Sequence, residues 1–270
     1  MGSRPQTATQ SANLRLISPK KRPKVAIVVP AFNEERNIEK VLADISELRN
    51  AQTGWEILPI IVNDGSTDRT EWVLNRIADR YGAKVISLPL NLGIGRAVQA
   101  GFRLAVQLGA DVTLQLDGDG QHPAGQIPTI VAPILANEAD VAVGSRYMSG
   151  AGGNVSSKWR QAGTWFFSKL LAVLVGVEIT DATSGFRAFS FEAADFVARY
   201  YPDDYPEVEA YVPLARRGFK IREFPVTMRA RIQGRSSITP FRSIYYMVKV
   251  AFATLINVIR IVPQRRRRDG

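Results

Sequence analysis

The sequence has 270 residues and a hydrophobic content of 46%, which is enough for a sizeable core and excludes wholesale disorder. It contains no cysteine and one histidine, His122, which excludes disulfides and thiolate metal sites and argues against a Ser-His-Asp triad. Lys and Arg number 35 against 25 Asp and Glu, and the resulting net charge of +10 favours an anionic partner.

The first 22 residues are polar and end in basic residues, so we expect a disordered basic arm without the apolar segment of a signal peptide. Apolar, β-branched runs then alternate with helical patterns. The expected strands are Lys24–Val29, Trp55–Val62, Lys84–Leu88 and Val112–Leu116. The expected helices are Asn37–Leu48, one with Trp72, Val73, Ile77 and Ala78 on one face, and one that ends near Leu108. This alternation predicts an α/β fold with a mostly parallel sheet, helices on both faces, and a ligand site at the carboxyl ends of the strands.

The last of these strands runs into Asp117-Gly-Asp-Gly-Gln-His-Pro123. Two carboxylates so close together repel each other unless a cation lies between them, and a hard divalent ion takes oxygen ligands while leaving positions for phosphate. One hypothesis is that Asp117, Asp119 and Gln121 hold Mg²⁺ or Mn²⁺ with a bound diphosphate. The alternative is a solvated Asp-Gly turn. We expect His122 to hydrogen-bond beside this loop rather than to bind metal.

Other ligand classes find less support. Gly93-x-Gly95 lacks the third glycine of a dinucleotide-binding fingerprint and follows the third expected strand, and no P-loop is present. No nucleic-acid-binding motif occurs, and much of the excess positive charge lies in the tails, so we do not expect nucleic acid as a partner.

Several further motifs follow one another along the chain. They are Pro30-x-Phe-Asn-Glu34, Asn63-Asp-Gly-Ser-Thr-Asp68, Asn91-x-Gly-x-Gly95, Asp117-x-Asp-x-Gln-His-Pro123, Gly144-Ser-Arg-Tyr147, Asp181-x-Thr-Ser-Gly-Phe-Arg187, Phe224-Pro-Val226 and Arg231-x-x-Gly-x-Ser236. In this order they resemble glycosyltransferase family 2 with its GT-A fold, and more closely the dolichyl- or polyprenyl-phosphate sugar synthases. The resemblance covers about residues 24–240 and implies a three-layer α/β/α nucleotide-sugar-binding domain.

The resemblance also implies roles for individual residues. The nucleotide-sugar donor would contact Pro30, Phe32, Glu34, Asp64, Asp117, Gly118 and Asp119, with Asp64 on the base. Asp117 and Asp119 would bridge the metal and the donor, with Gln121 as a further ligand and Asp119 as a catalytic residue. Arg146, Arg160 and Arg231 would bind phosphate, for which a planar guanidinium is suited; the alternative for each is a solvated surface charge.

Three positions leave alternatives open. Asp181 is a candidate general base, an acceptor-site residue or a helix cap. Glu207 and Glu209 precede an apolar helix expected over Ala210–Ala215 and could equally be cap-region charges. The chain departs from the family where Asn63 replaces an Asp, which indicates a structural role, and where Ser237 replaces a Lys, for which Arg235 is the possible substitute.

Two apolar stretches raise the question of a membrane. Residues 162–177 are too short and too charged to span a bilayer, and a core helix is favoured over a membrane-facing one. Residues 243–262 combine an apolar face (Met247, Phe252, Leu255, Ile256, Ile259) with a cationic stripe and are followed by Arg265–Arg268. That pattern predicts an amphipathic helix lying in an anionic membrane surface; the alternative is a helix packed on the domain.

The expected organisation is an arm over 1–22, a catalytic domain over 23–238, and an interfacial helix with a polyarginine tail over 239–270. The expected function is an inverting glycosyltransferase that moves a hexose from a GDP-mannose or UDP-glucose type of donor to a polyprenyl phosphate, at the cytoplasmic face of the cell membrane. The alternatives are a hydroxyl acceptor, a silent nucleotide-sugar-binding protein and a nucleotidyltransferase.

Overall fold

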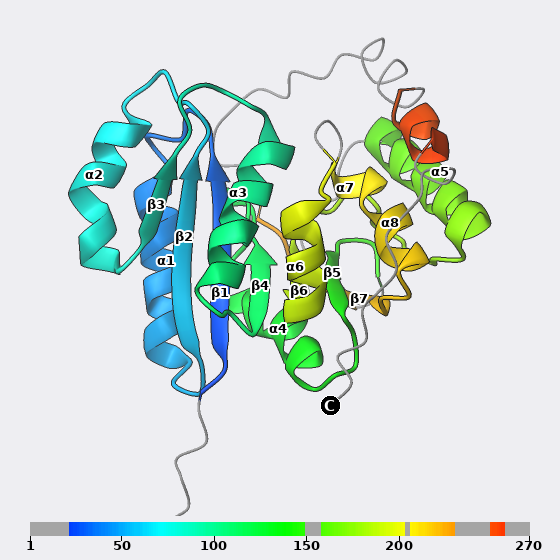
Figure 1. Ribbon diagram of the computed structural model, residues 1–270, viewed down its shortest axis with the longest axis horizontal. Helices are drawn as coiled ribbons and strands as arrows, with labels where there is room; N and C mark the ends of the chain where they lie inside the picture. Colours follow the sequence, from blue (N-terminus) through cyan, green and yellow to red (C-terminus); the bar gives the residue numbers. More distant parts are fainter. Residues whose placement is uncertain (1–21, 149–157, 203–205, 230–248, 257–270) are drawn as a thin grey trace, which may run out of the picture.

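The computed structural model of the protein describes residues 22–148, 158–202, 206–229 and 249–256 (Figure 1). The strands are β1 (Lys24–Ala31), β2 (Glu56–Asn63), β3 (Lys84–Ser87), β4 (Val112–Gln115), β5 (Val141–Ser145), β6 (Arg187–Ser190) and β7 (Ile221–Pro225). The helices are α1 (Ile38–Ala51), α2 (Thr70–Tyr81), α3 (Ile94–Gln107), α4 (Ile127–Leu135), α5 (Lys158–Val175), α6 (Phe191–Arg199), α7 (Pro206–Glu209) and α8 (Tyr211–Arg216). A short 3₁₀ helix, Ala124–Gln126, precedes α4.

The strands form one sheet in the order β3-β2-β1-β4-β6-β5-β7, with helices on both faces (Figure 1). Successive residues of β1 point to opposite faces, and both faces are buried: Val28 belongs to the core on the side of α3 and α6, and Ile27 to the core on the side of α1 and α4. Burial on both faces explains why β1 is continuously apolar in sequence. The predicted three-layer α/β/α architecture is confirmed.

The direction of β6 decides what lies at the carboxyl edge of the sheet. The β1–β2, β1–β4, β2–β3 and β5–β7 pairs are parallel, whereas β6 runs antiparallel to both β4 and β5. Arg187, the first residue of β6, is therefore paired with Gln115 at the end of β4 and with Val143 near the end of β5. The turn that precedes β6 consequently lies at the same edge as the loops that follow β1, β2, β4 and β5.

The expected helical face of α2 was partly wrong. Val73, Ile77 and Ala78 pack against the core, and Leu74 is fully buried, but Trp72 is 58% exposed. Its ring instead lies under the guanidinium of Arg76, 4.8 Å away. Trp72 and Arg76 are one helical turn apart, so the i, i+4 spacing lets them pack on each other at the surface. The same spacing is found between residues on the buried face of a helix.

Residues 162–177, expected as a core helix, fall almost wholly within α5, which is buried on one face only. Phe167 and Leu171 are buried in the core, whereas Trp165 is 64% and Val173 84% exposed. None of the helices in the described ranges combines the length and apolarity needed to cross a bilayer.

The described part of the C-terminal region, residues 249–256, is helical. Val250 and Thr254 are buried, whereas Phe252, Leu255 and Ile256 are 65%, 44% and 49% exposed. The apolar face expected for this helix is thus turned away from the core at these three residues. The rest of the predicted amphipathic helix, the arginine tail and the N-terminal arm up to residue 21 lie outside the described residues.

Candidate active site

A cavity of about 360 Å³ opens at the carboxyl ends of β1, β2 and β4. All seven residues that the sequence assigned to the donor line it, namely Pro30, Phe32, Glu34, Asp64, Asp117, Gly118 and Asp119. Ala31, Asn91, Gly93, Ile94 and Ala97 complete the lining and had no assigned role. The Asn91-x-Gly93 motif was the sequence signal for this second wall, which is the loop that leads into α3.

That loop is held in place from β2. Asp64 is 3% exposed, and its two carboxylate oxygens accept hydrogen bonds from the backbone N–H groups of Leu92 (2.8 Å) and Gly93 (2.9 Å). Gly65 has a φ of +63°, and a Cβ added there would lie 2.3 Å from the carbonyl carbon of Leu90. Only glycine permits this close approach. Asp64 therefore shapes the cavity as well as lining it, and its contact with a base stays a prediction.

The structural role expected for Asn63 is confirmed. The side chain is buried; its amide oxygen accepts from the N–H of Ser66 (3.1 Å), and its amide nitrogen donates to the hydroxyl of Ser87 (3.4 Å). Asn63 thus ties the loop after β2 to the end of β3.

The two carboxylates after β4 differ in their surroundings. Oδ1 of Asp117 is buried and has no hydrogen-bond partner within the described part of the chain. Asp119 accepts bonds from the backbone N–H (3.0 Å) and the side-chain nitrogen (2.5 Å) of Gln121. Gln121 thus turns its amide nitrogen, not its oxygen, toward Asp119, and acting as a metal ligand would require the amide to turn over. Its role as a ligand stays a prediction.

A divalent cation fits this donor set. Mg²⁺ and similar hard ions are commonly bound by one or two carboxylates together with substrate phosphates. A buried carboxylate oxygen without a partner is costly, and a cation would satisfy it. The described residues contain no group of three or more His, Asp or Glu side chains that could hold a metal by themselves. Phosphate oxygens of a ligand could complete the coordination of an ion held by Asp117 and Asp119.

His122 supports the carboxylate loop, as expected. It is buried, its Nδ1 accepts from the backbone N–H of Asp117 (3.4 Å), and its ring stacks on Phe186 with the centroids 4.9 Å apart. The stacking fixes the ring, so the imidazole holds the backbone of Asp117 in place.

Arg146 and Asp181 form a buried ion pair beyond the cavity. Asp181 is fully buried, and its carboxylate accepts from Nε of Arg146 (2.7 Å), from Nη2 (2.8 Å) and from the backbone N–H (3.2 Å). Burial opposes the charge of Arg146, but the hydrogen bonds and the attraction to Asp181 outweigh it and raise its pKa above the ordinary value. The carboxylate of Asp181 is thus engaged by Arg146, which supports a role in orienting that arginine, and its role as a general base stays a prediction. Asp181 is not a helix cap, because no helix begins there.

The other two phosphate-binding candidates are not tested by the structure. Arg160 falls in the first turn of α5, and Arg231, like Arg235 and Ser237, lies outside the described residues.

One buried charge below the site had no assigned role in the sequence. Arg187 is fully buried and donates to the carbonyl oxygens of Ser184 (2.7 Å), Pro206 (3.4 Å) and Glu207 (2.5 Å). Its guanidinium also lies 4.8 Å from the centre of the Tyr211 ring. These bonds tie the turn before β6 to α7.

Glu207 and Glu209, for which cap-region charges were one expectation, lie in the first turn of a separate short helix, α7, rather than at the start of α8. Glu209 is buried, and burial raises the pKa of Glu207 above its ordinary value although the nearby Arg187 opposes that rise. A hydrophobic pattern cannot distinguish an acidic residue at the start of a surface helix from one enclosed by a neighbouring segment.

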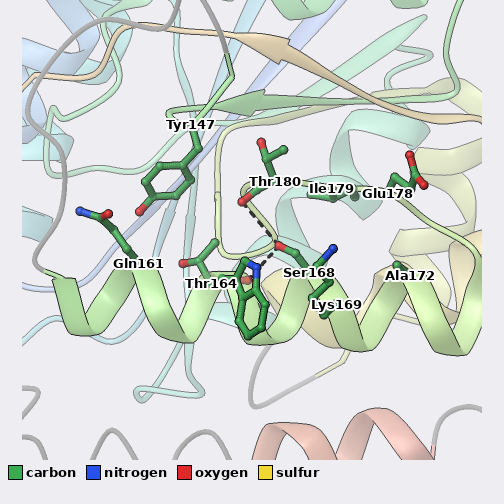
Figure 2. Close-up of a pocket in the computed structure, with 10 residues that line it drawn as sticks. Tyr147, Gln161, Thr164, Ser168, Lys169, Ala172, Glu178, Ile179 and Thr180 are labelled. Atoms are coloured by element: carbon green, nitrogen blue, oxygen red, sulfur yellow. Dashed lines mark hydrogen bonds between the residues drawn. The ribbon is translucent and has the colours of Figure 1, made fainter.

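A second cavity, of about 660 Å³, lies between α5, Tyr147 and residues 178–180 (Figure 2). Its floor is tied together by Ser168, whose hydroxyl contacts the carbonyl oxygens of Thr164 (2.8 Å) and Thr180 (3.5 Å). The cavity begins beside the ion pair, because Tyr147 follows Arg146 and Thr180 precedes Asp181 in sequence. Trp165, Ala172 and Ile179 give it apolar walls.

Open α/β sheets bind ligands in the crevice at the carboxyl ends of their strands, which is where this carboxylate-lined cavity lies. The profile of glycosyl transferase family 2 matches residues 26–197. The chain belongs to this family and has its GT-A fold.

Relatives with assigned names point the same way. The undecaprenyl-phosphate mannosyltransferase of Micrococcus luteus is 30% identical over 220 residues, covering 80% of this chain and 88% of that protein. The dolichyl-phosphate hexose transferase of Haloferax volcanii is 30% identical over 219 residues, covering 80% and 87%. A mannosyltransferase from Pyrobaculum calidifontis, solved with GDP-mannose and Mn²⁺, has a TM-score of 0.61 at 18% identity, covering 90% of this chain and 67% of that one.

Proposed function

We propose that this protein is an inverting hexosyltransferase that moves a hexose from a nucleoside-diphosphate sugar to a polyprenyl phosphate at a membrane surface. The observation that carries the proposal is a carboxylate-lined cavity at the strand ends together with a second cavity that begins beside the Arg146–Asp181 ion pair. The second cavity is lined by both apolar and polar side chains.

The donor occupies the first cavity in this proposal. Phe32 is 43% exposed at its rim and offers a flat face to a base, while Asp117 and Asp119 hold Mg²⁺ or Mn²⁺ against the diphosphate. The ion, when bound, offsets the negative charge that grows on the leaving nucleoside diphosphate. The Pyrobaculum structure, which contains GDP-mannose and Mn²⁺, supports this assignment.

The acceptor is a phosphate ester rather than a hydroxyl group. A hydroxyl acceptor needs a general base, and Asp181 is fully buried and engaged with Arg146. A phosphate monoester is already largely ionised near neutral pH, since its second pKa is about 6. Arg146 positions it, one phosphate oxygen attacks C1 of the hexose, and the bond from C1 to the diphosphate breaks with inversion. The names of the Micrococcus and Haloferax relatives support a lipid phosphate.

The lipid chain of the acceptor extends along the second cavity, whose lining includes Tyr147, the residue after Arg146, and the apolar residues Ala172 and Ile179 (Figure 2). Trp165 and Val173 on α5 and Phe252, Leu255 and Ile256 in the C-terminal helix are exposed and apolar. In this proposal they insert into the lipid surface, and the arginines at 265–268 bind its anionic head groups from the cytoplasmic side.

The test is a donor screen. Radiolabelled GDP-mannose and UDP-glucose are each incubated with Mg²⁺ or Mn²⁺ and a short polyprenyl phosphate, and the organic phase is analysed for lipid-linked sugar. One donor is expected to give a labelled, acid-labile lipid phosphate sugar. Labelling of a soluble alcohol instead of the lipid would overturn the acceptor, and donor binding without any transfer would indicate a silent binding protein. Release of pyrophosphate would indicate a nucleotidyltransferase.

A further inference from the structure

Glu223 lies on the edge strand β7, outside both cavities. Its two carboxylate oxygens accept hydrogen bonds from the backbone N–H groups of Thr180 (2.6 Å) and Asp181 (2.7 Å). Burial raises the pKa of Glu223 above its ordinary value, even though these hydrogen bonds favour the charged form. The half-buried carboxylate thus clamps two consecutive amides of one turn, which lie more than 40 residues earlier in the chain.

The clamped turn carries the carboxylate that orients Arg146. The N–H of Asp181 is fixed by Glu223, its carbonyl oxygen accepts from the N–H of Ser184 (3.1 Å), and its side chain holds Arg146 through Nε and Nη2. Within the described part of the chain, no hydrogen bond is assigned to Nη1 of Arg146. Nη1 is thus the guanidinium nitrogen that could donate to a ligand while Nε and Nη2 hold Asp181.

We infer that Glu223 is a positioning residue for the acceptor phosphate, which acts through the amides of Thr180 and Asp181 to fix where Arg146 presents Nη1. The inference rests on the proposed function for the identity of the ligand, but the relay from Glu223 to Arg146 is a property of the protein alone. Glu223 lines neither cavity, so we expect it to affect acceptor binding through Arg146 without contributing to donor binding.

The variant is Glu223→Gln. An amide side chain offers one acceptor oxygen, so one of the two backbone N–H groups loses its partner, and the new NH₂ group faces it. Loss of one charge-assisted hydrogen bond corresponds to a change of about tenfold. The KM for the polyprenyl phosphate should rise about tenfold while the KM for the sugar donor and kcat at saturating acceptor stay unchanged. An equal rise in the donor KM, or no rise in the acceptor KM, would overturn the inference.

The matched control is Glu138→Gln. Glu138 is 54% exposed and pairs with Arg222, the neighbour of Glu223 on β7, at 3.4 Å. The Glu138→Gln variant removes one negative charge near β7 but leaves the turn at Thr180 and Asp181 unchanged, so the KM values for both substrates should stay at the wild-type level. If Glu223→Gln fails to fold, Glu223→Asp keeps the charge on a shorter side chain and should give a smaller rise in the acceptor KM; an unchanged KM in that variant counts against the inference.

A substrate-free measurement separates this inference from the proposed function. In ¹H–¹⁵N spectra the amide signals of Thr180 and Asp181 and the Nε–H signal of Arg146 report the three links of the relay. Glu223→Gln should shift all three, whereas Glu138→Gln should not. If the wild type uses no lipid phosphate but these signals shift, the proposed function fails and the relay stands. If the Arg146 signal does not move, the inference is wrong whatever the acceptor.

Discussion

Removing the charge of Asp181 should be among the most destabilising single polar substitutions in the protein. The structure offers a direct comparison between two Asp–Arg pairs with the same 2.7 Å contact. In the Arg146–Asp181 pair the side chains are 16% and 0% exposed, and in the Arg199–Asp195 pair they are 65% and 32% exposed. The pairs thus differ strongly in burial, and also in that Arg199–Asp195 is an i, i+4 pair within α6 whereas Arg146 and Asp181 lie 35 residues apart.

Asp181→Asn leaves the buried guanidinium of Arg146 with a neutral partner that accepts fewer of its hydrogen bonds. Breaking a buried ion pair in this way costs about 3–5 kcal/mol, whereas an exposed pair is worth about 0–1 kcal/mol. The free energy of unfolding, measured by urea titration, should thus fall by about 3 kcal/mol or more in Asp181→Asn and by less than about 1 kcal/mol in the control Asp195→Asn. Equal losses in the two variants would refute the argument from burial.

The same variant distinguishes two roles for Asp181 in catalysis. A residue that only orients Arg146 affects the acceptor KM, and kcat at saturating acceptor is largely retained. A general base affects kcat by about 10² or more at unchanged KM. A large loss of kcat with intact binding of both substrates would support Asp181 as a base and favour a hydroxyl acceptor.

Three further outcomes are expected. Asp119→Ala should abolish the Mn²⁺-dependent part of nucleotide-sugar binding, measured by calorimetry with and without EDTA; unchanged binding would remove the metal from the proposal. Phe252→Glu should weaken binding to anionic liposomes roughly tenfold or more, because burying a Phe side chain contributes about 1.5–3 kcal/mol, and Trp72→Glu, which changes an equally exposed ring on α2, should not. Gly65→Ala should lower the free energy of unfolding by more than Gly109→Ala. Both glycines have a positive φ, but of the two only Gly65 would place the new Cβ closer than 3 Å to backbone atoms. Similar losses in the two variants would show that the backbone at Leu90 and Asn91 moves to accommodate the Cβ.

The donor cavity was predictable because its residues follow strand ends. Each polar loop of the first half comes directly after an apolar run, and a parallel sheet brings such loops to one edge whatever the details of packing. Phe32, Asp64 and Asp117 come from three different strand ends, and all line the same cavity. Local pattern was therefore sufficient to bring these loops to one edge, whereas the donor roles of the individual residues came from the resemblance to the family.

The acceptor side was not predictable in the same way because its contacts join distant segments. The partner of Arg146 lies 35 residues later in the chain, and Glu223 lies a further 42 residues beyond Asp181. Nothing in the local sequence around Asp181 distinguishes a buried, paired carboxylate from an exposed base, since both occur in polar turns. Only the pairing of β5 with β6 and β7 determines the choice.

The antiparallel strand explains how one sheet edge can serve two substrates. If β6 ran parallel to β4, the turn before it would lie at the opposite edge, away from Asp117. Because it runs antiparallel, that turn returns to the carboxyl ends of β4 and β5, where Gly185 approaches Asp117 so closely that a Cβ would lie 3.0 Å from both carboxylate oxygens. Thr180 lies five residues before Gly185, and its backbone N–H is one of the two that donate to Glu223. One reversed strand thus connects the carboxylate proposed for the donor to the arginine proposed for the acceptor, and a shift on either side should be felt by the other.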